Sequence, residues 1–237
     1  MKGIYLVGGY PDRVRFLACA EAVASCGFDF IEIGLPYNDP IADGPAIAAA
    51  IHEALSSGVT PGGVLEDVRA MDDLPLSRFI MTYANIIHAR GFARFSDEMR
   101  GRIKGVIIPD LPNRMARFFL EQGFGIPIVP FATLETRERD AAALEEYPAP
   151  FVYFVGVRGV TGAAGNLDSE EIARGIAMLR ERTRKKIVIG FGIKTPRDAE
   201  RALSLADGYV VGTEAVRRQK DPEDLRRYLA SLAGERS

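Results

Sequence analysis

The sequence has 237 residues, of which 47% are hydrophobic and 26% are charged, so it can bury the core of one large domain. We therefore expect residues 1–237 to form a single domain. The formal net charge of −2 gives no reason to expect nucleic acid or an anionic membrane as a partner. The chain opens with no secretion signal and contains no apolar run long enough to span a membrane, which predicts a cytoplasmic protein.

Cysteine and histidine are scarce in this chain. Cys19 and Cys26 fall on one predicted helix, too far apart along its axis for a disulfide, so we expect reduced core thiols. His52 and His88 are the only histidines, and neither lies in a cluster with the spacing of metal ligands. The sequence therefore predicts no metal site.

Apolar segments bounded by turn residues alternate with helix-forming segments along the chain. The apolar segments predict eight strands, at residues 4–7, 30–34, 78–82, 105–108, 126–129, 151–155, 187–189 and 209–211. The other segments predict helices at residues 13–25, 46–57, 61–71, 92–99, 114–122, 136–147, 169–182, 196–205 and 222–232. This alternation favours an α/β fold with a parallel sheet, and its closure gives a (β/α)8 TIM barrel. An open doubly wound sheet would give the same local pattern, but no G-x-G-x-x-G motif follows the first strand.

Two acids flank the loop after the second predicted strand. Alternation places Phe30, Glu32 and Gly34 on one face of that strand, so Glu32 sits in apolar surroundings, where a carboxylate is rarely buried without a partner or a task. Asp43 follows at the end of a loop rich in turn formers, so both acids reach the same strand end. Glu32 could instead be a salt-bridged core acid, and Asp43 could be a helix cap ahead of Pro45.

Glycine-bearing turns follow the last three predicted strands, at residues 159–162 (GVTG), 190–194 (GFGIK) and 211–216 (VGTEAV). Glycine lets backbone N–H groups approach an anion, and a helix beginning near Thr213 would aim its N-terminus at a phosphate. TIM barrels frequently bind phosphate after strands seven and eight. These glycines could also serve only as tight connections between strands and helices.

Two tyrosines could reach the predicted site, and the positions of the lysines argue against a Schiff-base mechanism. Tyr83 ends the third predicted strand and Tyr153 lies in the sixth, so both phenols could point into the barrel mouth, although aromatic residues there often serve packing alone. A Schiff-base mechanism would need a lysine at a C-terminal strand end, whereas Lys104 and Lys186 precede their strands. The two acids are left as the acid–base pair, because carboxyls in unlike surroundings can hold unlike pKa values.

Residues 32–45 (EIGLPYNDPIADGP) resemble the tryptophan synthase alpha subunit family, whose second strand and following loop read much the same. The resemblance extends over almost the whole chain, through MTYAN (81–85), PDLP (109–112), GVTG (159–162), GFGI (190–193) and VGTEAV (211–216). It implies retro-aldol cleavage of indole-3-glycerol phosphate to indole and glyceraldehyde 3-phosphate. Ala46 and Gly156 depart from the common pattern, since many members carry Thr and Ser at these positions.

The resemblance also implies roles for individual residues. Glu32 would protonate the indole ring carbon and help to deprotonate the side-chain hydroxyl, while Asp43 would hydrogen-bond the ring N–H and stabilise the cationic ring. The residues that would line the site are Tyr83 and Tyr153, with Phe191 packing on the ring of the substrate and Tyr5 contributing in a similar way. The residues that would hold the substrate phosphate are Gly162, Gly192, Gly212 and Thr213, and Lys194 could assist them.

A partner follows from the same resemblance. Members of the family pass indole through a tunnel to a pyridoxal-phosphate-dependent β subunit, whose binding orders loops that match residues 36–40 and the segment around Thr161. We therefore expect an α2β2 heterotetramer, with pyridoxal phosphate in the β subunit and no cofactor in this chain. Three alternatives stay open: another phosphate-binding barrel enzyme such as an isomerase, a stand-alone lyase that releases indole, and a non-catalytic barrel kept as a binding partner.

Overall fold

The computed structural model describes residues 1–156 and 167–233. Its eight strands form one parallel sheet in the order β4-β3-β2-β1-β8-β7-β6-β5. The strands are β1 (Lys2–Val7), β2 (Phe30–Gly34), β3 (Ser77–Met81), β4 (Gly105–Ile107), β5 (Phe131–Thr133), β6 (Phe151–Val155), β7 (Lys186–Ile189) and β8 (Gly208–Val211). The predicted (β/α)8 barrel is confirmed by this order, in which the first and last strands of the chain are neighbours.

The barrel closes where β4 pairs, through one bridge, with the segment just before β5. At this point the predicted bounds of the fifth strand were wrong. Val106 pairs with Ile128, and the N–H of Val106 donates to the Pro127 carbonyl at 2.8 Å. The predicted strand at 126–129 contributes only this bridge, and β5 begins after Pro130. The physical reason is that Pro127 and Pro130 carry no backbone N–H to donate to a ladder.

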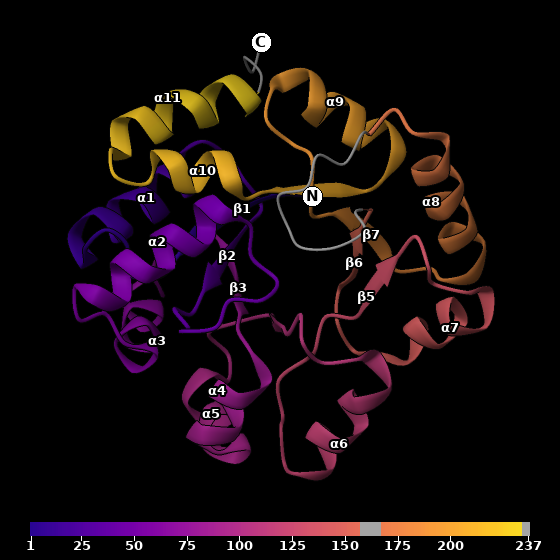
Figure 1. Ribbon diagram of the computed structural model, residues 1–237, viewed down its shortest axis with the longest axis horizontal. Coiled ribbons are helices and arrows are strands. Elements are labelled where there is room, and N and C mark those ends of the chain that lie inside the picture. Colours follow the sequence, from indigo (N-terminus) through magenta and orange to yellow (C-terminus); the bar gives the residue numbers. More distant parts are fainter. Residues whose placement is uncertain (157–166, 234–237) are drawn as a thin grey trace.

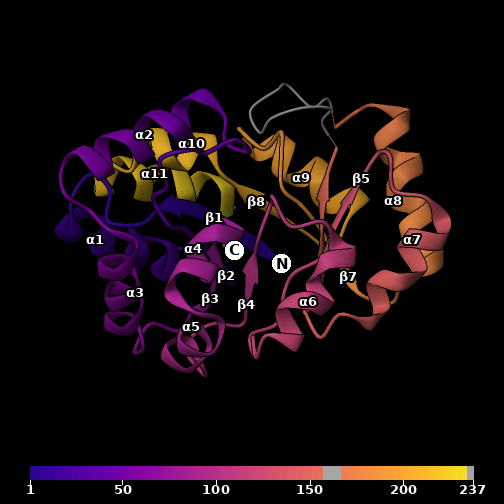
Figure 2. The same cartoon turned by 60° about the horizontal axis from the view of Figure 1, so that its bottom comes forward.

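Helices surround the strands, as Figures 1 and 2 show. The helices are α1 (Arg13–Ser25), α2 (Pro45–Ser56), α3 (Pro61–Ala70), α4 (Ala84–Arg90), α5 (Phe92–Met99), α6 (Ala116–Glu121), α7 (Glu138–Ala143), α8 (Glu170–Arg182), α9 (Pro196–Leu205), α10 (Thr213–Arg218) and α11 (Pro222–Ala233), with short 3-10 turns at Asn113–Met115 and Leu144–Glu146. Within the described residues, no helix is both long and apolar enough to cross a bilayer.

Local sequence signals account for several helix ends. Asp12 caps α1, because its side chain accepts a hydrogen bond from the N–H of Arg15. Thr60 caps α3 in the same way and is followed by Pro61 at the first helical position. Helix α4 was not predicted, since the residue before it, Tyr83, offers no side-chain cap.

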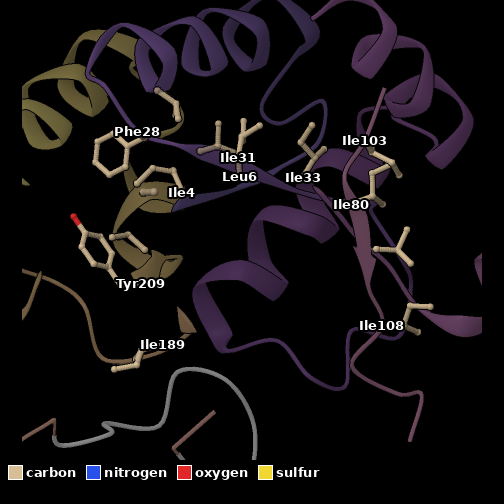
Figure 3. Close-up of a cluster of buried hydrophobic side chains, with 14 of the residues drawn as sticks. Ile4, Leu6, Phe28, Ile31, Ile33, Ile80, Ile103, Ile108, Ile189 and Tyr209 are labelled. Carbon is tan, nitrogen blue, oxygen red and sulfur yellow. The ribbon is translucent and has the colours of Figure 1, made fainter. Parts of the chain in front are cut away.

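Alternation along each strand produces two apolar layers. The outer layer lies between the strands and the helices, and Figure 3 shows part of it, including Ile4 and Leu6 of β1 and Ile31 and Ile33 of β2. The inner layer fills the barrel and has an aromatic core of Phe30, Phe79 and Phe151. The ring centroids of these three residues lie 5.1 to 5.6 Å apart, from β2, β3 and β6. The aromatic core therefore fills the barrel interior near the N-terminal ends of β2 and β6, and we call it the barrel floor.

Replacing Phe151 by Ala should lower the free energy of unfolding by about 3 to 5 kcal/mol, because the other two rings cannot move to fill the space. Urea denaturation would measure this loss. Phe118→Ala on α6 is the matched control, since that ring is 45% exposed and its removal should cost much less. Equal losses in both variants would show that the barrel floor does not carry the stability assigned to it.

Candidate active site

A cavity of about 740 Å³ opens at the C-terminal ends of the strands. Its walls include the last residues of three strands, Met81, Ile107 and Val155, and the residues directly after β7 and β8, Gly190 and Gly212. Active sites of (β/α)8 barrels lie at this end, and the volume suits a small molecule. The cavity is therefore the place where the predicted site residues need to meet.

Glu32 lies in the wall of this cavity, in the middle of β2, with only 1% of its surface exposed. The Tyr153 hydroxyl donates a hydrogen bond to Glu32 Oε2 at 3.2 Å. Burial raises the pKa of Glu32 to about 8, with the Tyr153 hydrogen bond acting in the opposite direction and the charge of Asp43 in the same one. No arginine, lysine or histidine forms an ion pair with Glu32 among the residues described, so the alternative of a salt-bridged core acid is not supported.

Asp43 lies in the wall of the same cavity and is 9% exposed. Its Oδ2 accepts a hydrogen bond of 2.7 Å from the Tyr83 hydroxyl. Burial raises the pKa of Asp43 to about 6, while the Tyr83 hydrogen bond lowers it. Asp43 is not a helix cap, because α2 is preceded by Gly44 and shows no side-chain capping hydrogen bond. Both alternatives to a functional acid pair therefore find no support.

Two phenols flank Glu32, Tyr5 from the neighbouring strand β1 and Tyr153 from β6. Tyr5 is paired with Glu32 in the register of β1 and β2, and Tyr5 and Tyr153 both line the cavity. Each ring needs a glycine beside it. A Cβ at Gly34 would lie 2.1 Å from the Tyr5 hydroxyl oxygen, and a Cβ at Gly190 would lie 1.9 Å from a Tyr153 ring carbon. The glycines therefore make room for the phenols that surround the buried carboxyl.

Tyr83 and Phe191 are placed differently from Tyr5 and Tyr153. Neither is among the residues that line the cavity, and both are buried. Tyr83 reaches the site through its hydroxyl, which contacts Asp43. Phe191 packs on Phe154 at a centroid distance of 6.2 Å and fills the space that a Cβ at Gly156 would need, 2.4 Å from a ring carbon. Contact between Phe191 and a substrate ring stays a prediction.

The predicted phosphate-binding residues are brought together only in part. Gly212 lines the cavity, and Thr213 begins α10 directly after it. Gly192, which has a φ of +77°, lines a separate cavity of about 400 Å³ beside α9. Gly162 lies outside the described residues, and Lys194 is exposed. Within residues 1–156 and 167–233, no cluster of acids, histidines and cysteines could hold a metal ion.

Sequence reasoning assigned no role to several residues that shape the site. Phe131 lines the cavity and contacts Tyr153 at a centroid distance of 5.4 Å; it was missed because the predicted fifth strand ended at residue 129, before Phe131. Asp110 accepts the N–H of Ala84, directly after Tyr83, at 3.0 Å. Asp110 and its loop belonged to a motif used for the resemblance, which was the signal available for finding it.

Comparison with known proteins agrees with this geometry. Residues 4–234 match the family model "Tryptophan synthase alpha chain". The chain is 36% identical over 236 residues to a tryptophan synthase alpha chain of Chlorobium phaeobacteroides, covering 93% of this chain and 88% of the relative. It is 34% identical over 230 residues to one of Thermotoga petrophila, covering 94% and 93%.

Solved structures also match this chain over nearly its whole length. A structure of Mycobacterium tuberculosis tryptophan synthase superposes with a TM-score of 0.89 at 29% identity, covering 98% of this chain and 90% of that one. A structure from Aquifex aeolicus superposes with a TM-score of 0.88 at 32% identity, again covering 98% and 90%. The chain belongs to the tryptophan synthase alpha chain family, the lyases of tryptophan biosynthesis that cleave indole-3-glycerol phosphate to indole and glyceraldehyde 3-phosphate.

Proposed function

We propose that the cavity at the strand ends binds indole-3-glycerol phosphate and that Glu32 and Asp43 divide the acid–base work of its cleavage. The observation that carries this proposal is that two buried carboxyls open into one cavity with unlike pKa values, about 8 for Glu32 and about 6 for Asp43. At neutral pH Glu32 keeps its proton while Asp43 has lost its own. One group can then donate a proton where the other supplies negative charge.

The reaction needs a proton at one end of the breaking bond and its removal at the other. Glu32 donates its proton to the indole ring carbon that carries the side chain, which leaves a positive charge on the ring. Asp43 accepts a hydrogen bond from the ring N–H and stabilises that charge. Glu32, now a carboxylate, takes the proton of the adjacent hydroxyl as the carbon–carbon bond breaks. The bonding electrons restore the indole ring, the aldehyde forms, and Glu32 ends the cycle protonated again.

The remaining predicted residues serve binding in this proposal. Tyr153 holds the Glu32 carboxyl by its hydrogen bond, and Tyr5 packs beside it. Gly212, which lines the cavity, and Thr213 directly after it offer backbone N–H groups to the substrate phosphate. Participation of Gly162 and of Gly192, which lines the separate cavity, stays a prediction. Apolar side chains of the wall, such as Ile107, Val155 and Val210, offer a surface for the indole ring.

The family acts with a β subunit. We propose that this chain joins its β subunit in an α2β2 heterotetramer in the cytoplasm, with pyridoxal phosphate held by the β subunit and no cofactor in this chain. Indole is small and apolar and would leave the site into water unless a partner received it.

Replacing Glu32 by Gln should lower kcat by at least about 10²- to 10⁴-fold, because the amide cannot donate or accept the transferred proton. Indole release followed by absorbance measures turnover, and calorimetry with indole-3-glycerol phosphate should still detect binding. The matched control is Glu66→Gln on the exposed face of α3, which should keep full activity. A Glu32→Gln enzyme with most of its turnover would exclude Glu32 from proton transfer.

The pH dependence of kcat should be bell-shaped. Activity should rise through pH of about 6 as Asp43 ionises and fall through pH of about 8 as Glu32 loses its proton. Because the two groups interact, the midpoints describe the pair rather than each residue alone. The measurement is the initial rate of indole release at saturating substrate. A profile that is flat across both midpoints would contradict the assignment.

Adding the β subunit should raise the rate of indole formation, since partner binding would order the loops around the cavity. The rate is compared with and without purified β subunit, in the absence of any co-substrate for the β reaction. Analytical ultracentrifugation of the mixture should give the mass of an α2β2 complex. High turnover by the isolated chain that does not change with the β subunit would favour a stand-alone lyase.

A further inference from the structure

The Asp43 carboxyl is fixed by contacts from outside its own loop. The Tyr83 hydroxyl donates to Asp43 Oδ2 at 2.7 Å and accepts the N–H of Ala42 at 3.1 Å. Tyr83 lies between β3 and α4, directly before the helix, so it belongs to a different connection from the loop that carries Asp43. The position of Asp43 therefore depends on the position of one phenol.

That phenol is held in turn by a second tyrosine. The ring of Tyr37, from the loop between β2 and α2, lies 4.9 Å from the Tyr83 ring at an interplanar angle of 37°. The Tyr37 hydroxyl accepts a hydrogen bond of 2.6 Å from Nδ2 of Asn85, in the first turn of α4. Tyr37 thus connects the loop to Asn85 and to Tyr83. A continuous series of contacts links Asn85, Tyr37, Tyr83 and Asp43.

We propose that Tyr37 is a positioning residue for the reaction, which acts on Asp43 through Tyr83. Tyr37 does not line the cavity, and no role in substrate contact is assigned to it. Anchored by Asn85, its ring keeps Tyr83 in the orientation from which the hydroxyl reaches Asp43. This inference rests on the proposed participation of Asp43 in catalysis.

The titratable groups around Asp43 determine how its pKa would change if Tyr37 no longer held Tyr83 in place. The titratable groups that interact with Asp43 are Tyr83 after β3, Tyr5 on β1, Glu32 on β2 and Tyr153 on β6, and Asp110 lies near Tyr83. None of these groups is a cation, and among them only Tyr83 donates a hydrogen bond to Asp43 in the part of the chain described. Weakening the Tyr83 contact would therefore raise the pKa of Asp43 further.

The experiment compares the rising limb of the pH profile of kcat in wild type, Tyr37→Ala, Tyr83→Phe and the double variant, with the β subunit present. Tyr83→Phe should move the midpoint upward by roughly one pH unit or less, as expected for one hydrogen bond to a charged group. Tyr37→Ala should move it in the same direction, by no more than Tyr83→Phe does. The double variant should show no shift beyond that of Tyr83→Phe. Titration of the substrate phosphate is common to all four enzymes, so it cancels in the differences.

Two further variants separate positioning from general loosening of the loop. Asn38→Ala, at the exposed neighbouring position, should leave the midpoint unchanged. Tyr37→Phe keeps the ring and loses only the Asn85 hydrogen bond, so it should be shifted less than Tyr37→Ala and remain folded even if the alanine variant does not. Adding Asn85→Ala to Tyr37→Phe should then give no further shift.

Two results would overturn the inference: a wild-type midpoint in both folded Tyr37 variants, or shifts of Tyr37→Ala and Tyr83→Phe that add in the double variant. Asp43→Asn distinguishes this failure from failure of the proposed function. If Asp43→Asn is inactive while the Tyr37 variants titrate like wild type, only the positioning role of Tyr37 is lost. If Asp43→Asn keeps full kcat, the catalytic role of Asp43 is wrong and the inference fails with it.

Discussion

The burial of one carboxyl inside the barrel is the constraint on which the rest of the site depends. Glu32 occupies an inward position of β2, where it is 1% exposed and its described hydrogen-bond partner is the Tyr153 phenol. A charged carboxylate would pay a large desolvation cost there, whereas a protonated one would not. Burial therefore favours the protonated form of Glu32 at neutral pH. The carboxyl lies in the wall of a cavity whose size suits a small substrate. In the proposed mechanism Asp43, in the wall of the same cavity, supplies the complementary negative charge.

Small and aromatic residues from several strands make this arrangement possible. Gly34 and Gly190 leave space for the rings of Tyr5 and Tyr153, so two phenols can stand beside Glu32 without displacing the strands. The aromatic core below them closes the barrel interior. Asp43 comes from the loop between β2 and α2, and the hydrogen bond from Tyr83 attaches it to the connection between β3 and α4. The two proposed catalytic carboxyls thus come from different kinds of element, Glu32 from a strand and Asp43 from a loop.

The sequence predicted much of the fold because most of its signals are local. Strand β2 and helix α5 were predicted at their observed bounds, from apolar patterning and from the alternation of strand and helix segments. The fifth strand was misplaced because prolines at 127 and 130 interrupt a segment that is otherwise apolar. Glu32 could be singled out because an acid in an apolar strand is unusual. Contacts such as Tyr83 with Asp43 join residues forty positions apart, so they could not be read from local patterns.

Glu32 should hold its proton at neutral pH because it is buried and, in the part of the chain that the structure describes, no cation forms an ion pair with it. Carbon-13 NMR of the side-chain carboxyls, with Glu32 assigned by comparison with a Glu32→Gln spectrum, tests this directly in the absence of substrate. The titration midpoint of Glu32 should lie near its raised pKa of about 8. A midpoint near the usual glutamate value of 4.5 would contradict it, because Glu32 would then be ionised at neutral pH and could not act as the acid.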